Sequence, residues 1–203
     1  MQVNAIIFDL GRVVVDIDVE HFGRSVLAGM AVENPDAAIQ QIMADELVAA
    51  FNTGKISPED FHKAVCKKYR VAVSYAEFVK LWCSIFKPMP GVEALLKELR
   101  GKVALGLLSN TDVLHWRYLL RQYPELGFFQ RPTLSFETGL MKPSPQIYLI
   151  AAENVHTQPE NCFYLDDLQT NVEGARRVGM DAVLFQSIDR LRRELNERGI
   201  LKL

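Results

Sequence analysis

The chain lacks the features that mark secreted, membrane-spanning and nucleic-acid-binding proteins. It has only three cysteines, Cys66, Cys83 and Cys162, whose odd number and wide spacing fit neither a disulfide framework nor a metal-binding motif. No apolar run approaches the length that crosses a membrane, and no basic segment of the signal-peptide kind opens the chain. We therefore expect a cytoplasmic protein whose thiols stay reduced.

Charge of one sign is also scarce. The 23 Lys and Arg residues nearly balance the 25 Asp and Glu residues, giving a formal net charge of −2. Neither a nucleic acid nor a membrane surface is an expected partner of such a chain. At 203 residues and 49% hydrophobic content, the chain is long enough for one large core and a smaller lobe. Its oligomeric state cannot be predicted.

Short apolar runs alternate with helical patterns over much of the chain. Almost continuous apolar runs typical of buried parallel strands occupy residues 3–8, 103–109, 161–166 and 181–185, with a weaker candidate at 132–136. Helical spacing separates the later strands, at residues 90–99, 112–123, 144–154 and 171–179. This alternation predicts an α/β fold with a doubly wound, Rossmann-like parallel sheet.

Only helices are predicted between the first two strands. Ser or Asn caps and first-turn prolines or acids favour helices at residues 34–51, 57–69 and 74–86, and prolines interrupt the chain at 87–91. We expect an all-helical cap at residues 19–87, inserted into a catalytic core of residues 1–18 and 88–203. Hinges are expected near Asp18 and at 87–91.

Polar residues follow the predicted strands, where an open parallel sheet binds its ligands. These residues are Asp9 after the first strand, Ser109, Asn110 and Thr111 after the second, and Asp166 and Asp167 after the fourth, with Lys142 before a later helix. Singly, most of them have a simpler interpretation as helix caps or solvated charges. Asp9 is harder to explain that way, because an unpaired acid buried beside an apolar strand is unstable.

Four segments in order resemble the motifs of the haloacid dehalogenase-like (HAD) hydrolase superfamily. They read FDLGRVVVD, LLSNT, GLMKPSPQIY and FYLDDLQTNVEGARRVGM, and the resemblance covers essentially the whole chain. It is closest to helical-cap phosphatases, in particular bacterial enzymes that hydrolyse α-glucose 1-phosphate. The resemblance implies a phosphoric monoester hydrolase with Mg²⁺ as cofactor and a small phosphate ester as substrate. The subgroup that it most resembles implies a sugar 1-phosphate.

The resemblance also implies roles for individual residues. Asp9 attacks phosphorus and forms an aspartyl-phosphate, with Lys142 as the second catalytic residue that neutralises phosphate charge and pairs with the acids in the empty site. The implied magnesium ligands are Asp9, Asp166, Asp167 and the carbonyl of Gly11. The implied phosphate-binding groups are Ser109, Asn110, Lys142 and the amides of Leu10 and Gly11. Asn171 is implied to orient Asp166 or Asp167.

Gly11 departs from the family pattern. Most phosphatases of the superfamily have an aspartate two residues after the nucleophile, where it protonates the leaving alcohol and then activates water. General acid help is worth roughly 10²- to 10⁴-fold in rate, so its absence favours a substrate with a good leaving group, such as a sugar 1-phosphate. Replacement of that acid by Asp16 or Asp18 is the less favoured alternative, because pairing with basic residues or closing the turn explains both acids more simply.

The missing acid also leaves rival functions open. A 2-haloacid dehalogenase needs neither that acid nor magnesium, but Asp166 and Asp167 would repel Asp9 unless a cation were present. A phosphomutase relies more heavily on the missing acid. A catalytically weak phosphate-binding regulatory protein is the non-enzymatic alternative, and it would bind phosphate without turnover.

The predicted cap supplies candidates for substrate selection. They are His21, Arg24, Phe51, Asn52 and Lys55, the last three near a glycine-containing turn at residues 51–57. Packing or solvation explains Phe51 and Lys55 equally well. His115 lines the pocket or packs its helix, and Trp116 is expected to pack.

Overall fold

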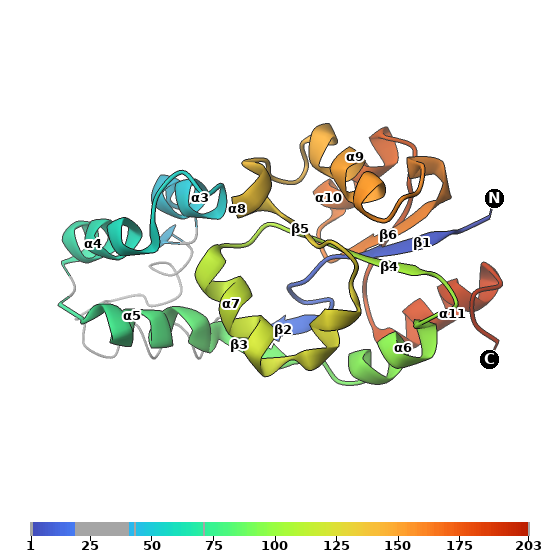
Figure 1. Ribbon diagram of the computed structural model, residues 1–203, viewed down its shortest axis with the longest axis horizontal. Helices are drawn as coiled ribbons and strands as arrows, with labels where there is room; N and C mark the ends of the chain where they lie inside the picture. The colour runs from blue at the N-terminus through green and yellow to red at the C-terminus, as the bar shows by residue number, and fades with distance from the viewer. Residues whose placement is uncertain (1, 19–40, 43, 71, 203) are drawn as a thin grey trace.

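A five-stranded parallel sheet forms the centre of the molecule (Figure 1). The computed structural model describes residues 2–18, 41–42, 44–70 and 72–202. The sheet has the order β5-β4-β1-β6-β7. Its strands are β1 (Ala5–Phe8), β4 (Ala104–Ser109), β5 (Thr133–Leu134), β6 (Cys162–Asp166) and β7 (Asp181–Leu184). All five predicted strands are present, and the predicted α/β fold class is confirmed.

Helices cover both faces of the sheet, which explains why its strands are apolar at successive positions. In β1, Ile6 and Phe8 pack toward one layer, whereas Ala5 and Ile7 pack toward the other. The first layer contains α6 (Val92–Leu99), α7 (Val113–Gln122) and α11 (Ile188–Glu197). The second contains α9 (Pro145–Asn154) and α10 (Gln169–Arg177).

Two helical segments of this core were not singled out in the sequence. One is α11, whose N-cap Ser187 accepts a hydrogen bond from the Arg190 N–H. The other is α8 (Ser135–Thr138), a single turn that directly follows β5. The predicted run at 132–136 therefore divides into a two-residue strand and the start of a helix.

Three described helices form a separate group beside the core, on the left of Figure 1. They are α3 (Glu46–Asn52), α4 (Pro58–Tyr69) and α5 (Tyr75–Trp82). Their contact is aromatic: Phe61 stacks on Phe51 at 4.3 Å between ring centroids and meets Trp82 edge-on at 5.0 Å. We call this group the cap helices.

The predicted continuous helix at 34–51 is interrupted before α3. Residues 41 and 42 are helical, but α3 begins only at Glu46, after a turn at Ala44 and Asp45. The cause is Asp45, whose carboxylate accepts a hydrogen bond from the Leu47 N–H and so caps a new helix. The expected N-terminal signals at Asn34 and Pro35 lie outside the described residues.

A short antiparallel ribbon connects the core to the cap helices. Strand β2 (Val15–Ile17) pairs with β3 (Phe86–Pro88), with Ile17 opposite Phe86. The expected turn after the first strand thus ends in a strand, and the proline-containing linker begins with one. The two places where the chain is expected to cross between core and cap lie side by side, while the cap boundaries at 19 and 87 stay a prediction. Among the described residues, no helix is long and apolar enough to span a membrane.

Candidate active site

The carboxyl ends of the central strands bring the predicted site residues to one edge of the sheet. Asp9 follows β1, and its N–H donates to the Leu165 carbonyl at 2.9 Å, which extends the pairing with β6. Because Phe8 is level with both Leu107 and Leu165, Asp9 lies beside the ends of β4 and β6. Ser109 and Asp166 are the last residues of those two strands.

Lys142 connects these strand ends. Its Nζ lies 2.6 Å from Asp9 Oδ1, 2.7 Å from Asp166 Oδ2 and 3.3 Å from the Leu108 carbonyl oxygen. The ammonium therefore uses its three donors on three acceptors, and its side chain is only 2% exposed. The alternative of a solvated surface lysine is wrong. Lys142 pairs with the acids as the sequence predicts.

Asn110 positions the main chain of Lys142. Its amide Oδ1 accepts from the Lys142 N–H at 2.8 Å, and its Nδ2 donates to the Lys142 carbonyl at 3.1 Å. Both ends of this amide are therefore engaged with protein. The predicted contact between Asn110 and phosphate stays a prediction, and the second hydrogen of Nδ2, which these two bonds leave unused, is the side-chain donor for it.

Asp166 is held by a full set of donors. Its carboxylate accepts from the Leu168 N–H at 2.9 Å and from Asn171 Nδ2 at 3.0 and 3.2 Å, and the Tyr164 hydroxyl also donates to it. Asn171 is thus placed to orient Asp166 rather than Asp167. The sequence reasoning missed Tyr164, although residues two apart on a strand share one face.

A second missed pair of contacts fixes the loop after β4. The Ser135 hydroxyl accepts from the Thr111 N–H and donates to the Thr111 carbonyl, both at 2.9 Å. The cap of α7 is Asp112, which accepts from the Leu114 and His115 N–H groups. Ser109 and Asn110 do not cap that helix, so the simpler interpretation of these two residues fails.

Three carboxylates surround the same point. Asp9, Asp166 and Asp167 each offer an oxygen, and these oxygens all lie within 4.8 Å of one another. Lys142 and Arg12, whose guanidinium is 3.5 Å from Asp167, are the cations beside them. Hard oxygen donors around an excess of negative charge fit Mg²⁺, which takes few protein ligands and keeps several waters. The donor set therefore suits the expected cofactor.

Burial and charge shift the pKa values of these groups in different directions. Burial raises the pKa of Asp9 to about 7, against the opposing effect of Lys142 and with a further increase from Asp166. Burial also raises the pKa of Asp167, and neighbouring Asp166 adds to that increase. For Asp166, burial acts upward, but Lys142, Tyr164 and the Leu168 N–H outweigh it and lower its pKa. Crowded carboxylates that favour a shared proton are typical of a site that binds a cation.

An open cavity lies against these residues. Its volume is about 190 Å³, and we call it the strand-end cavity; its lining includes Asp9, Gly11, Ser109, Lys142 and Asp167. Within the described part of the chain, neither Asp9 Oδ2 nor the Ser109 hydroxyl makes a hydrogen bond. Both oxygens are therefore available to a ligand, whereas the Leu10 N–H is bound to Asp9 Oδ1 at 2.7 Å.

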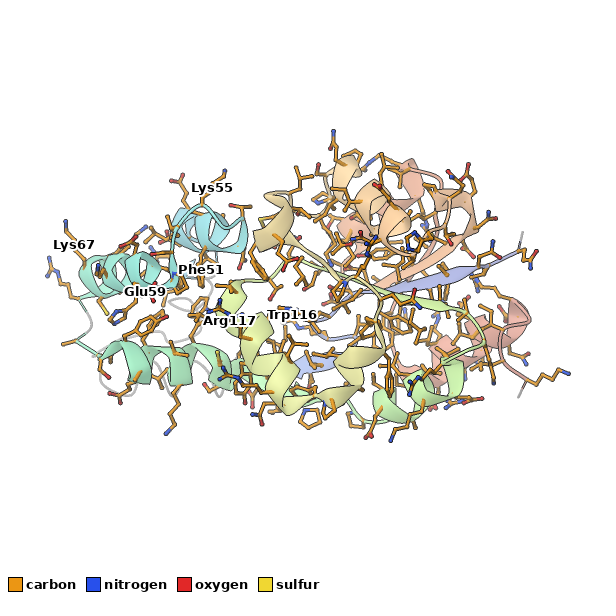
Figure 2. All side chains as sticks on the ribbon, in the orientation of Figure 1. Phe51, Lys55, Glu59, Lys67, Trp116 and Arg117 are labelled. Atoms are coloured by element: carbon orange, nitrogen blue, oxygen red, sulfur yellow. The ribbon has the colours of Figure 1, made fainter. Side chains whose placement is uncertain are left out.

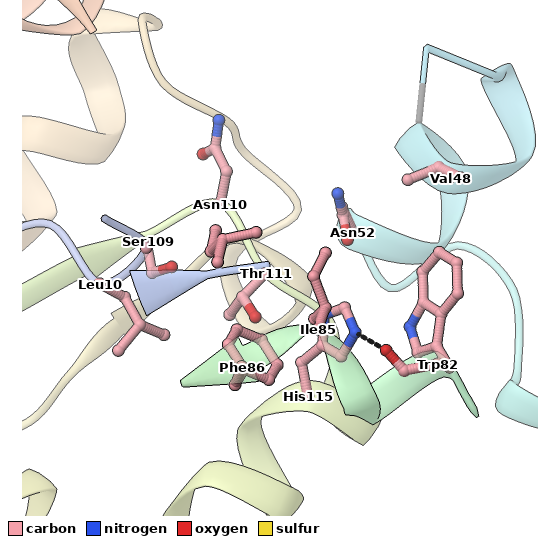
Figure 3. A pocket seen from close by; sticks show the side chains of 12 residues that line it. Leu10, Val48, Asn52, Trp82, Ile85, Phe86, Ser109, Asn110, Thr111 and His115 are labelled. Carbon is pink, nitrogen blue, oxygen red and sulfur yellow. Dashed lines mark hydrogen bonds between the residues drawn. The ribbon is translucent and has the colours of Figure 1, made fainter. Parts of the chain in front are cut away.

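A second cavity adjoins the first on the side of the cap helices (Figure 3). Its volume is about 110 Å³, and we call it the cap-side cavity. Gly11, Ile17, Ser109 and Asn110 line both cavities, so the two meet at these residues. The rest of its lining is mainly apolar and aromatic: Leu10, Val48, Trp82, Ile85 and Phe86, with polar groups from Asn52, Thr111 and His115.

A buried network closes the far side of the cap-side cavity. Asp112 Oδ2 lies 2.9 Å from Trp82 Nε1 and 2.9 Å from His115 Nδ1. His115 Nε2 lies 2.9 Å from the Trp82 carbonyl oxygen (Figure 3). Burial acts to raise the pKa of Asp112, but the contacts with His115 and Trp82 outweigh it and lower that pKa. This network ties α5 of the cap helices to α7 of the core.

The residues predicted to select the substrate lie in different places. Asn52 lines the cap-side cavity. Phe51 is 1% exposed and packs inside the cap helices, while Lys55 is exposed and points away from them (Figure 2). His21 and Arg24 lie outside the described residues. Trp116 packs against the core, as expected.

The turn at 51–57 approaches the core without placing a charged side chain in either cavity. Gly54 has a φ of +66°, and a Cβ there would lie 2.3 Å from the Phe136 carbonyl oxygen of α8. Only glycine fits such a close approach. Asp16 and Asp18 belong to the ribbon: Asp16 accepts from the Ile17 N–H, and Asp18 lies 2.5 Å from Lys87 Nζ. Neither acid lines the two cavities.

Comparison with known proteins agrees with this geometry. The family model described as haloacid dehalogenase-like hydrolase matches residues 3–179, which is most of the chain. The chain belongs to this family. The resemblance seen in the four motifs is therefore confirmed at the level of the HAD superfamily, whereas the narrower likeness to enzymes acting on α-glucose 1-phosphate stays a prediction.

Individual HAD relatives are distant. The chain is 22% identical to a D-ribitol-5-phosphate phosphatase of Bacteroides thetaiotaomicron over 89% of this chain and 90% of the relative. It is 36% identical to a glyceraldehyde 3-phosphate phosphatase of Methanopyrus kandleri, but over 48% of this chain and 42% of that protein. A HAD family enzyme of Bacteroides thetaiotaomicron, solved with magnesium and inorganic phosphate, has a TM-score of 0.78 at 23% identity, covering 92% of this chain and 96% of that one. At such identity the structural likeness shows the fold alone.

Proposed function

We propose that this HAD hydrolase is a magnesium-dependent phosphatase that transfers the phosphoryl group of a small ester to Asp9 and then to water. The observation that carries the proposal is the placement of Lys142 Nζ between Asp9 and Asp166, with Asp167 beside them. Asp9 also lines an open cavity, and among the described residues its Oδ2 has no hydrogen-bond partner. A carboxylate with one free oxygen next to a fixed cation is suited to nucleophilic attack on an anionic phosphorus centre.

The first step would be carried out by Asp9. Its Oδ2 forms a bond to phosphorus, the bond from phosphorus to the ester oxygen breaks, and that oxygen leaves with the electron pair. Lys142 and the Ser109 hydroxyl line the same cavity, and we expect both to bind phosphate oxygens during this transfer, Lys142 after it releases one of the acceptors that now engage its three N–H groups. A water oxygen then bonds to phosphorus, the bond to Asp9 breaks, and the carboxylate is restored while the water proton passes to solvent.

Asp9, Asp166 and Asp167 would bind Mg²⁺. When bound, the ion offsets the repulsion between a carboxylate and a dianionic phosphate. The same positive charge favours the ionised form of Asp9, which is the form that can attack. Asp166 would be held in register for this role by Asn171 and Tyr164. The Gly11 carbonyl stays a predicted further ligand.

The substrate would be an activated phosphate, and we propose a sugar 1-phosphate as the first candidate. Gly11 has no side chain to protonate the leaving oxygen, and general acid help is worth roughly 10²- to 10⁴-fold. An anomeric oxygen carries negative charge better than an ordinary alkoxide, so its esters suffer least from that loss. Two relatives are named for small phosphorylated carbohydrates, which supports the same size and polarity of substrate.

The test is a panel assay with and without Mg²⁺, on the wild type and Asp9→Asn. The panel contains α-glucose 1-phosphate, acetyl phosphate, p-nitrophenyl phosphate, glycerol phosphate and a 2-haloacid. We expect phosphate release that needs Mg²⁺ and disappears in Asp9→Asn, with α-glucose 1-phosphate ahead of glycerol phosphate. Halide release that survives EDTA would identify a dehalogenase, and phosphate binding without turnover would identify a regulatory protein. Either result contradicts the proposal.

A further inference from the structure

Ile17 occupies the space into which a side chain at position 11 would extend. A Cβ built on Gly11 would lie 2.6 Å from Ile17 Cδ1 and 3.6 Å from Ile17 Cγ1. The first distance is far below normal contact, and the second is ordinary contact. A single methyl group, the δ-methyl of Ile17, therefore accounts for the steric conflict.

Ile17 is held in this place from two sides. Its main chain pairs with Phe86 in the β2–β3 ribbon, and its side chain packs against the cluster of the cap helices. It also lines both the strand-end cavity and the cap-side cavity. The δ-methyl thus lies near the junction through which an ester would connect its phosphate to its leaving group.

The described residues around this junction offer no spare acid. The carboxyl groups lining the strand-end cavity belong to Asp9 and Asp167, and the described lining of the cap-side cavity has none. Asp9 is the nucleophile in the proposed reaction, and Asp167 is placed as a cation ligand. His115 has both ring nitrogens engaged, with Asp112 and with the Trp82 carbonyl.

We propose that Ile17 is a specificity-determining residue, which together with Gly11 keeps an acid away from the leaving oxygen. This inference rests on the proposed phosphatase function and extends it to a residue of the ribbon. The ester oxygen leaves with the electron pair of its bond to phosphorus and takes a proton from water only afterwards. The enzyme therefore selects esters with weakly basic leaving groups, and its cap-side cavity offers them an apolar surface instead of a proton.

The test measures kcat/KM for a series of aryl phosphates of increasing phenol pKa, extended to glycerol phosphate. For the wild type with Mg²⁺ we expect a steep decline as the leaving group becomes more basic. This first measurement needs no variant, so it does not depend on how any substitution folds. A steep fall of kcat/KM with rising phenol pKa is what we expect of an enzyme that gives the leaving oxygen no proton.

The second measurement adds an acid at position 11. Gly11→Asp alone is expected to lower kcat/KM for p-nitrophenyl phosphate, because the new side chain displaces the Ile17 δ-methyl into the junction. Adding Ile17→Val removes only that methyl and leaves the ordinary Cγ1 contact. The double variant is expected to hydrolyse glycerol phosphate at least about tenfold faster, relative to p-nitrophenyl phosphate, than the wild type does.

Ile85→Val provides the matched control for this rescue. Ile85 also lines the cap-side cavity and loses the same methyl group, but it is not the residue in conflict with position 11. Combined with Gly11→Asp, it is expected to give no rescue. Thermal unfolding of every variant separates loss of folded protein from loss of rate.

The outcomes separate the inference from the function on which it rests. A wild type that hydrolyses glycerol phosphate as fast as aryl phosphates overturns the inference and leaves the phosphatase function standing. Equal rescue by Ile85→Val overturns it as well. No hydrolysis of any phosphate ester by the wild type overturns both, and that result is read from the whole panel, which includes α-glucose 1-phosphate and p-nitrophenyl phosphate.

Discussion

The two adjoining cavities are built on opposite principles. The strand-end cavity is lined mostly by polar and charged residues, of which Asp9 and Lys142 are fixed by buried hydrogen bonds. The cap-side cavity is mainly apolar, and its lining comes from the cap helices, the ribbon, α7 and the segments that follow β1 and β4. The difference implies that the first cavity determines whether reaction occurs, whereas the second determines which leaving group enters. Each prediction below tests that division.

Removal of the divalent cation should have the largest effect on the strand-end cavity. Chelation is expected to abolish turnover and added Mg²⁺ to restore it, because three carboxylates repel one another and the phosphate. Mg²⁺ at a hundredfold excess over its dissociation constant should stabilise the fold by about 2.7 kcal/mol, measured as a rise in Tm. Asp167→Asn should weaken that rise, while Asp189→Asn, an exposed acid of α11, should not. If Mg²⁺ left the Tm of the wild type, Asp167→Asn and Asp189→Asn unchanged, the assignment of the three carboxylates as a cation site would be contradicted.

Lys142→Met should also act through the strand-end cavity. The substitution removes the ammonium and leaves Asp9 and Asp166 without their shared partner. Breaking a buried ion pair costs about 3 to 5 kcal/mol, part of which protonation of Asp9 can offset. We expect kcat to fall at least about a hundredfold. Lys55→Met, at an exposed lysine of the cap helices, serves as control and should leave kcat near the wild-type value. Similar kcat values for Lys142→Met and Lys55→Met would contradict the role of Lys142 in the strand-end cavity.

Trp82→Phe should affect the cap-side cavity without altering the chemistry. It removes the Nε1–H that donates to buried Asp112 at 2.9 Å, while the ring that stacks on His115 is largely kept. Leaving a buried carboxylate without one donor costs about 1 to 3 kcal/mol of unfolding free energy. Denaturant unfolding measures this loss, and steady-state kinetics should show a change mainly in KM. Trp116→Phe is the control, because the Trp116 side chain packs against the core cluster and makes none of the side-chain contacts of this network. Equal losses for the two variants would count against the role of Asp112.

Asp45→Asn should have the smallest effect, within the cap helices alone. Contacts with Lys68 and Tyr69 come first among the causes that lower the pKa of Asp45 to about 2. Because the folded pKa lies below the unfolded value, this group stabilises the fold above about pH 4, and that contribution is lost as pH falls toward 2. Asparagine still caps α3, so we expect a loss of at most about 1 kcal/mol at pH 7 that vanishes near pH 2. A pH-independent difference in unfolding free energy would refute this explanation.

The difference between the cavities also explains what the sequence could predict. Asp9, Ser109 and Asp166 were found because each follows a strand of a parallel sheet, and the chain order of strands determines which ends meet. Tyr164 could have been found from strand alternation. Asn110 looked like a phosphate ligand, and only the fold shows that its amide binds the main chain of Lys142.

The cap-side cavity was much less predictable. Its apolar residues look like ordinary core residues in the sequence, because no local pattern distinguishes a residue that lines a cavity from one that packs in the core. Ile17 was part of a presumed turn, and its proximity to Gly11 depends on how the ribbon folds back. The break before α3 was missed because Asp45 caps a helix inside a longer helical pattern. Long-range packing determines each of these features.

The central claim is that Asp9 becomes phosphorylated during turnover, and direct trapping tests it. The enzyme is mixed with Mg²⁺ and a phosphate ester labelled at phosphorus, quenched in acid within the first turnover, and digested for peptide mapping. The account predicts label on the peptide that contains Asp9, released by hydroxylamine as expected for an acyl phosphate, and no label in Asp9→Asn. Phosphate release at the full rate with no labelled peptide, or by Asp9→Asn, would contradict it.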